Sequence, residues 1–268
     1  MSEQQEGNKG SGKIKKLIES GSEIGGSVVG TSIGLAIAGP VGALTGAALG
    51  PLVCSAFKLV GNEIAEKIMS SREQARVGAT YTIALEKISN GIKAGKEIRG
   101  DDFFLKQKDD RSKSESILEG TLLKARNEYE EKKIKYYASF LANINFDKSV
   151  SFQQGNTLLR IVEQLSYRQL VIIAYLKEKE VLNTHNWMRA FSKQPELANY
   201  QDFYSELIDL YNHQLLQQVN EIAMSISSLK LSFLGNKLFD LLELDEIDDS
   251  DKKDIIETVF EINHLKLR

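Results

Sequence analysis

Hydrophobic and polar positions are unevenly distributed along this chain. Residues 24–57 contain no charged side chain, and Glu23 and Lys58 bracket them. Small residues recur in this stretch at every fourth position: Gly26, Gly30, Gly34, Ala38, Gly42, Gly46 and Gly50. Residues four apart lie on one face of an α-helix, so the repeat predicts a smooth strip that a second helix backbone can approach closely. An uncharged surface of this length must be buried, either in protein or in lipid.

The uncharged stretch divides at Gly39-Pro40. Proline lacks a backbone N–H and suits the first turn of a helix, so this dipeptide predicts the turn of a helical hairpin. Each arm has about 17 residues, roughly 25 Å of helix, which is slightly short of the ~30 Å hydrocarbon core. Lysines and arginines flank the hairpin but are absent from its turn, which predicts that both ends face the cytoplasm.

These features favour insertion into the inner membrane and a homo-oligomer that forms through the glycine strips. The alternative is a hairpin packed inside a folded domain. Glycine in a water-exposed helix costs about 1 kcal/mol relative to alanine, and eight glycines lie between residues 24 and 57. That cost favours lipid, although the short arms leave packing in protein open.

Residues 24–57 resemble the glycine- and alanine-rich hydrophobic helical hairpins of membrane-active bacterial proteins, including the hairpin at the centre of pore-forming colicins. This resemblance covers no other part of the chain. It implies membrane insertion, with permeabilisation as one outcome. A membrane hairpin followed by a helical remainder also resembles the layout of toxin-type effectors in bacterial self-killing and phage defence.

After residue 61 the hydrophobic spacing of three to four residues is typical of packed helices. It predicts a helix from Asn62 to about Ile88, a short helix through Ile98, and a long helix from about Ser114 to Asn143. The polar segment 101–114 is predicted to be a loop. Its Phe103 and Phe104 are candidates for a satellite core under the loop or, alternatively, for an exposed partner contact.

Residues 147–268 have a different pattern of hydrophobic positions, which predicts shorter helices and two strands. Helices are predicted over 156–164, 167–179, 202–219, 235–244 and 250–262, with a pair of short strands between 222 and 233. Ser166 and Gln169 form a capping pair for the second of these helices. The order of elements over residues 157–244 resembles a winged-helix domain. Residues 202–220 contain three acidic residues but no Lys or Arg, so a protein partner is expected there and no nucleic acid.

The patterns together predict a mainly α protein in four parts. These are a flexible segment 1–23, the glycine-rich hairpin 24–61, a helical region 62–146, and a winged-helix-like domain 147–268 with a small β-hairpin. The 268 residues include 34 Lys and Arg and 37 Asp and Glu, a net charge of −3. Residues 71–150 carry +3 and residues 151–268 carry −6, so the C-terminal part should repel phosphate.

No motif in the sequence predicts catalysis. The pattern around Ser32 matches G-x-S-x-G, but it lies within a helical repeat with no strand before it. The three histidines, His185, His213 and His264, do not have metal-ligand spacing, and the acidic run 245–251 lacks the central glycine of a calcium loop. Cys54 is the only cysteine. We therefore expect no catalytic residue, no metal and no cofactor.

Two functions follow as expectations. The first is a membrane-associated bacterial effector, not an enzyme, whose glycine hairpin enters the inner membrane and oligomerises or perturbs it, with the soluble part in the cytoplasm. The alternative is a non-enzymatic adaptor or regulatory protein whose winged-helix-like domain binds a partner protein.

Overall fold

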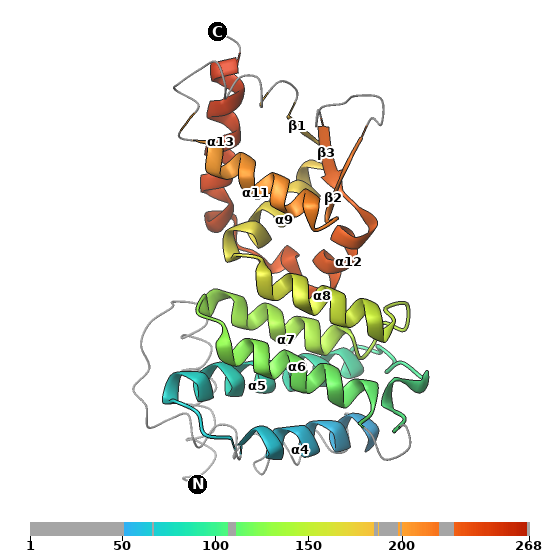
Figure 1. Ribbon diagram of the computed structural model, residues 1–268. Coiled ribbons are helices and arrows are strands. Elements are labelled where there is room, and N and C mark those ends of the chain that lie inside the picture. The colour runs from blue at the N-terminus through green and yellow to red at the C-terminus, as the bar shows by residue number, and fades with distance from the viewer. Residues whose placement is uncertain are drawn as a thin grey trace. The chain divides into compact units, whose positions relative to one another are not determined.

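The computed structural model describes residues 51–65, 67–106, 111–184, 187, 198, 200–219 and 228–266. Contacts between Cα atoms divide the chain into two compact units, Met1–Gln164 and Leu165–Arg268 (Figure 1). We call them the N-terminal and the C-terminal unit. The described residues are mainly helical, with one small antiparallel sheet, which confirms the predicted mainly α class.

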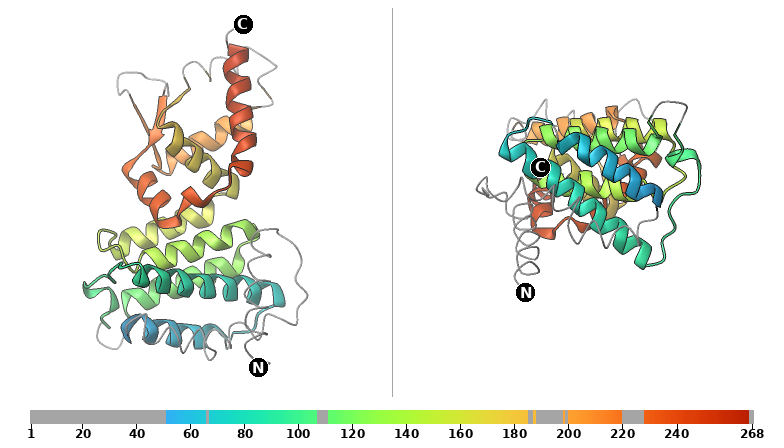
Figure 2. Two further views of the ribbon diagram at one scale, coloured as in Figure 1. Left: turned by 180° about the vertical axis from the view of Figure 1, so that it is seen from behind. Right: turned by 90° about the horizontal axis from the view of Figure 1, so that it is seen from below.

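The N-terminal unit is a stack of helices. In the part that the structure describes, its helices are α4 (Pro51–Ala65), α5 (Ser71–Lys93), α6 (Lys113–Asn127), α7 (Ile134–Asn143) and α8 (Phe152–Gln164). Two short 3-10 helices, Asp102–Phe104 and Glu131–Lys133, precede α6 and α7. α5 packs along α7 and α6, while α4 and α8 both contact α6, from opposite sides (Figures 1 and 2).

Helix α4 contains the last residues of the uncharged stretch. Val53, Phe57 and Val60 are buried on one face of this helix, and the helix packs against α6. The hydroxyl of Tyr81 on α5 donates a hydrogen bond to the Phe57 carbonyl, with an O–O distance of 3.0 Å. Residues 51–57 thus belong to an amphipathic helix of the unit, and α4 runs through the expected hairpin end at residue 61.

In the part of the chain that the structure describes, no helix is long and apolar enough to cross a membrane. This finding corrects the prediction of a transmembrane helix. Other residues of that prediction lie outside the described residues, namely the strip glycines Gly26, Gly30, Gly34, Gly42, Gly46 and Gly50 and the turn residues Gly39 and Pro40. The lipid partner, the homo-oligomer and the inner-membrane location stay predictions.

Three helix predictions in the N-terminal unit are wrong. The helix expected from residue 62 to 88 is two helices, because Ser70 begins α5 with a capping box. The short helix through Ile98 does not form. The long helix expected from 114 to 143 is interrupted at Glu128, whose backbone is extended.

The interruption after α6 has a local cause. The side chain of Glu128 is buried and accepts hydrogen bonds from the backbone N–H of Glu130 at 3.0 Å and the hydroxyl of Tyr137 at 3.1 Å. The ammonium of Lys133 lies 2.5 Å from the same carboxylate. Satisfying this buried charge requires the chain to turn back toward Glu128, which ends α6 and starts α7.

The C-terminal unit surrounds helix α9 (Tyr167–Lys179). The other elements among its described residues are β1 (Leu182–Asn183), α11 (Gln201–Asn212), β2 (Leu216–Gln218), β3 (Ser228–Leu231), α12 (Phe233–Leu242), a 3-10 helix (Leu244–Glu246) and α13 (Asp249–Lys266). Helix α9 contacts α12, α13, β3 and the 3-10 helix. Residues 169–176 are buried without interruption, as expected for a central helix that is covered on all sides.

The sheet has the strand order β1-β3-β2, and both pairings are antiparallel. Leu182 pairs with Leu229, and Leu216 pairs with Leu231. Leu229 and Leu231 are buried in the core, while Lys230 between them points to the other face, because side chains alternate along a strand.

Two predictions for this unit have opposite outcomes. The bounds of α9 and its capping pair Ser166 and Gln169 are confirmed. The helix expected over 202–219 is wrong after residue 212, because the chain turns at Gln214, with φ +60°, and enters β2. The spacing of Leu215 and Leu216 in the sequence is compatible with a helix. In the structure both are buried, but Leu215 follows the turn and Leu216 begins β2.

Candidate functional site

Phe103 and Phe104 are both buried, with 1% and 7% of their surface exposed. Their ring centroids are 5.3 Å apart in an edge-to-face arrangement. The guanidinium of buried Arg99 lies 4.2 Å from the centroid of Phe103 and donates hydrogen bonds to the carbonyls of Ile144 and Val150. The two phenylalanines therefore form a small core under the loop, and they are not an exposed partner contact.

Among the described residues, the polar side chains considered for chemistry are not brought together. Ser32 and His185 lie outside the described residues. The Nδ1 atoms of His213 and His264 lie 2.9 and 3.0 Å from backbone carbonyls four residues earlier. Among the described residues no group of three His, Cys, Asp or Glu side chains is arranged to hold a metal ion.

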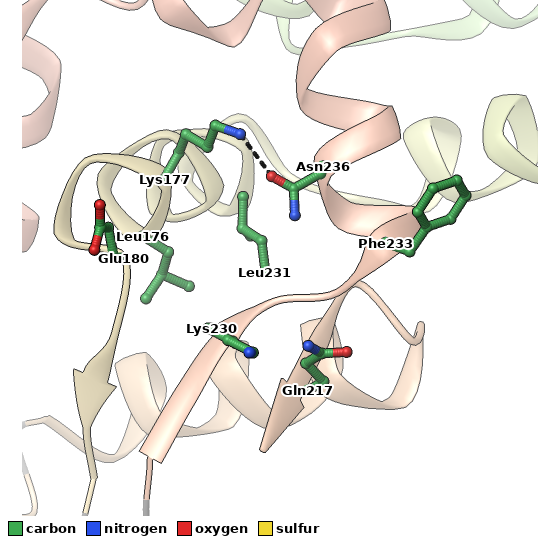
Figure 3. A pocket seen from close by; sticks show the side chains of 8 residues that line it. All are labelled: Leu176, Lys177, Glu180, Gln217, Lys230, Leu231, Phe233 and Asn236. Carbon is green, nitrogen blue, oxygen red and sulfur yellow. Dashed lines mark hydrogen bonds between the residues drawn. The ribbon is translucent and has the colours of Figure 1, made fainter. Parts of the chain in front are cut away.

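The structure instead reveals an open groove in the C-terminal unit, with a volume of about 410 Å³. It lies between the end of α9, strands β2 and β3, and the start of α12 (Figure 3). Eight residues line it: Leu176, Lys177, Glu180, Gln217, Lys230, Leu231, Phe233 and Asn236. Leucines form its apolar part, and its polar side chains come from four elements, α9, β2, β3 and α12.

Lys177 and Lys230 supply the positive charge of the groove. Lys177 is in the last turn of α9, and its ammonium donates a hydrogen bond to Oδ1 of Asn236 on α12 at 2.6 Å. The same ammonium lies 5.3 Å from the ring centroid of Phe239, a cation–π contact. Lys230 lies on β3 opposite Gln217 of β2. One lysine is thus held by α12 and the other by the sheet (Figure 3).

Phe233 is the first residue of α12 and is 76% exposed. The preceding Ser232 fixes its position, because the Ser232 N–H donates to the Leu215 carbonyl at 2.9 Å and its hydroxyl donates to the Gln214 carbonyl at 2.6 Å. A Cβ atom added at Gly235 would lie 2.1 Å from the carbonyl oxygen of Leu215, so glycine permits this close approach. The exposed ring therefore projects from a rigidly held helix start.

Glu180 lies where α9 ends and the chain turns toward β1. Its φ of 59° and ψ of −46° are unusual for a non-glycine residue. The N–H of Val181 donates to the carbonyl of Lys179 at 2.6 Å across this turn, which makes it a classic γ-turn, a rare and strained form. Strained residues concentrate at functional sites, and this one lies in the groove lining.

Ion pairs brace α9 against the helices beside it. Arg168 pairs with Glu206 of α11 and with Asp254 of α13, the latter at 3.1 Å. Burial raises the pKa of Glu206, and Arg168 opposes this shift. Buried Lys252 of α13 pairs with Glu178 of α9. Burial alone would lower the pKa of Lys252, but hydrogen bonds to Glu178 and Asp249 outweigh it and raise the pKa.

The sequence analysis missed the groove. Its residues come from positions 176, 177, 180, 217, 230, 231, 233 and 236, and no single segment carries a motif. The only signal was the short strands and the helix after them, which bring Lys230 and Phe233 near the end of α9. Comparison with protein-family models, with curated proteins and with solved structures found no match to this chain.

Proposed function

We propose that this chain is a non-enzymatic adaptor whose C-terminal unit is a winged-helix-like domain that binds a partner protein. The order of elements supports the fold part of this proposal: α9, β1, α11, β2 and β3 follow one another along the chain, and the strands are ordered β1-β3-β2. A winged helix has the same succession, with a recognition helix directly before the hairpin that forms its wing. Helix α11 occupies that place.

The composition of α11 supports the second part of the proposal, that the partner is a protein. Its twelve residues include Asp202, Glu206 and Asp209 but no Lys or Arg. A DNA-reading helix requires cations for phosphates and base edges, and three carboxylates repel the phosphate backbone. The whole C-terminal unit carries 11 Lys and Arg and 17 Asp and Glu, a net charge of −6. A protein surface is therefore the better partner for this helix.

The test uses the full-length chain with a photo-crosslinking amino acid in place of Ser205, which is exposed on α11. The matched control carries the same amino acid in place of Ser55, which is exposed on α4. Irradiation in extract of cells that make the protein should yield a crosslinked protein with the Ser205 variant only. That protein is then identified and purified, and its affinity for the unmodified chain is measured.

Charge reversal on α11 makes the test specific. We expect Asp202→Arg to weaken binding of the purified partner at least tenfold. Glu86→Arg, at an exposed position of α5, should leave the affinity within about twofold, because an exposed charge outside the contact contributes little. A labelled DNA duplex of mixed sequence should not bind the chain at low salt. Equal effects of the two reversals, or salt-dependent DNA binding, would overturn the proposal.

A further inference from the structure

We propose that the groove between α9 and α12 binds an acidic peptide segment of the partner protein, with an apolar side chain of that segment against Phe233. This inference rests on the proposed function, because it names the chemistry of the partner. It adds a binding site that is separate from α11. The charge, the shape and the apolar edge of the groove each support it.

The charge of the groove favours a negatively charged ligand. Its lining contains two lysines and one glutamate, so it is locally positive in a unit with a net charge of −6. The Lys177 ammonium uses one of its three N–H donors on Asn236. Lys230 has no ion pair within the described part of the chain. Donors on both lysines are therefore available to carboxylates, which they bind as charge-assisted hydrogen bonds.

The shape of the groove favours a peptide over a small molecule. Sites for small molecules typically bury 70–90% of the ligand surface in a mostly apolar cavity. This groove is open to solvent. Most of the residues that line it are polar (Figure 3). An extended chain does not need full enclosure, because its flanking residues add contacts beyond the groove.

Phe233 supplies an apolar edge to the same groove. Aromatic anchors contribute most when they are held rigidly and become buried on binding. Phe233 meets both conditions, since Ser232 and Gly235 fix the start of α12 and most of the ring is exposed. An apolar side chain next to the acidic residues of the peptide would cover this ring.

Glu180 provides discrimination at the rim. Glu180 would repel a carboxylate of the peptide. Acidic residues of the peptide are therefore favoured beside Lys177 and Lys230 and disfavoured beside the turn that follows α9. Repulsive contacts of this kind fix register as well as specificity. The expected segment therefore has neighbouring acidic residues and one apolar residue, in contrast to a uniformly acidic run.

The experiment measures binding of fluorescein-labelled peptides to the full-length protein by anisotropy. The probe alternates glutamate with leucine, and two matched peptides carry glutamine or lysine in place of glutamate. We expect the glutamate probe alone to bind. Lys177→Glu combined with Lys230→Glu should weaken this binding at least tenfold, and Phe233→Ala should weaken it several-fold.

The control variant is Lys253→Glu on α13 combined with Lys93→Glu on α5, both at exposed positions, which changes the net charge of the chain equally. It should bind the glutamate probe as the unchanged protein does, and circular dichroism verifies that both double variants remain folded. Equal loss in the control, or no binding of the glutamate probe, would overturn the inference. Competition by free glutamate or inorganic phosphate at similar concentration would identify a small anion as the occupant and would overturn it as well.

Two further measurements separate this inference from the proposed function. If the partner crosslinked through α11 binds the Lys177→Glu/Lys230→Glu variant with full affinity, the groove proposal fails and the adaptor function stands. If the glutamate probe binds but no protein crosslinks to α11, the proposed binding of a partner through α11 fails, and binding of acidic peptides by the groove stands. Self-association in sedimentation that is lost in the double variant would make a second copy the occupant and would overturn the inference.

Discussion

The buried ion pair of Lys133 and Glu128 shows how one residue can decide the course of the chain. Their side chains are 2% and 4% exposed, so both charges are removed from water. The hydroxyl of Tyr137 donates to the same carboxylate. Burial raises the pKa of Tyr137, and the negative charge of Glu128 raises it further. The tyrosine thus keeps its proton and serves as a donor to Glu128.

Lys133→Met should lower the free energy of unfolding by about 3–5 kcal/mol, because it leaves the Glu128 carboxylate buried without its cation. Adding Glu128→Leu to the same chain should recover part of the loss. No buried charge then remains, but the Tyr137 hydroxyl and the Glu130 N–H lose their acceptor. Denaturant titration of the full-length protein measures both effects. The control, Lys58→Met at an exposed position of α4, should change stability by less than about 0.5 kcal/mol; an equal loss in that control would contradict the argument.

Gly235→Ala tests the close approach of α12 to the chain before β2. The added Cβ would lie 2.1 Å from the carbonyl oxygen of Leu215, so the backbone must move, and we expect a loss of at least about 1–3 kcal/mol. Gly100→Ala is the control, because nothing lies within 4 Å of its added Cβ. Denaturant midpoints compare the two, and similar midpoints for both variants would show that this contact is not tight.

At the scale of elements, the ends of helices differ in how well the sequence predicts them. The capping pair Ser166 and Gln169 precedes and opens α9, and the start of this helix was predicted from that local signal. α5 and α6 begin with the same kind of capping box, at Ser70 and Ser112. The ends at Glu128 and Gln214 depend on a buried ion pair and on a turn into a strand, which have no short-range pattern in the sequence.

The capping box of α5 predicts a pH dependence. Hydrogen bonds from the Ser70 backbone and hydroxyl, and then from Arg126, lower the pKa of Glu73 from its usual 4.5 to about 2. The carboxylate is then more acidic in the folded than in the unfolded chain. Its contribution to stability is complete above pH 4.5 and is lost as the pH falls toward 2.

Glu73→Gln isolates this contribution, since glutamine can serve at the third helical position, as Gln169 does in α9. The free energy of unfolding is measured against pH for the unchanged protein and the variant. We expect the unchanged protein to be the more stable at neutral pH and the two curves to converge as the pH falls toward 2. Parallel curves over that interval would mean that Glu73 is not the titrating group.

At the scale of the whole molecule, each unit has a core of its own. Phe140 and Leu122 are fully buried in the N-terminal unit, and Leu170 and Leu207 in the C-terminal unit. The mainly α class followed from the hydrophobic spacing of the sequence. The groove did not, because its lysines lie 53 residues apart and meet only once the sheet has formed. Contacts of this separation are set by tertiary packing, which no local pattern reveals.

The two cores predict two separable unfolding transitions. Trp187 is the only tryptophan and is buried in the C-terminal unit, 6.1 Å from the ring of Phe203 between centroids. Its fluorescence therefore reports on that unit, whereas far-ultraviolet circular dichroism reports on the helices of both. Non-coincident transitions from two probes are the accepted sign of departure from two-state unfolding.

We expect Gly235→Ala to lower the denaturant midpoint seen by tryptophan fluorescence and Lys133→Met to leave it unchanged. Both variants should alter the denaturation curve measured by circular dichroism. Gly235→Ala should shift the transition of the C-terminal unit, and Lys133→Met should shift that of the N-terminal unit. The physical reason is that a lost interaction destabilises the cooperative unit that contains it. If Lys133→Met shifted the fluorescence midpoint as far as Gly235→Ala, the two cores would unfold as one, and a partner bound to the C-terminal unit would stabilise the whole chain by mass action.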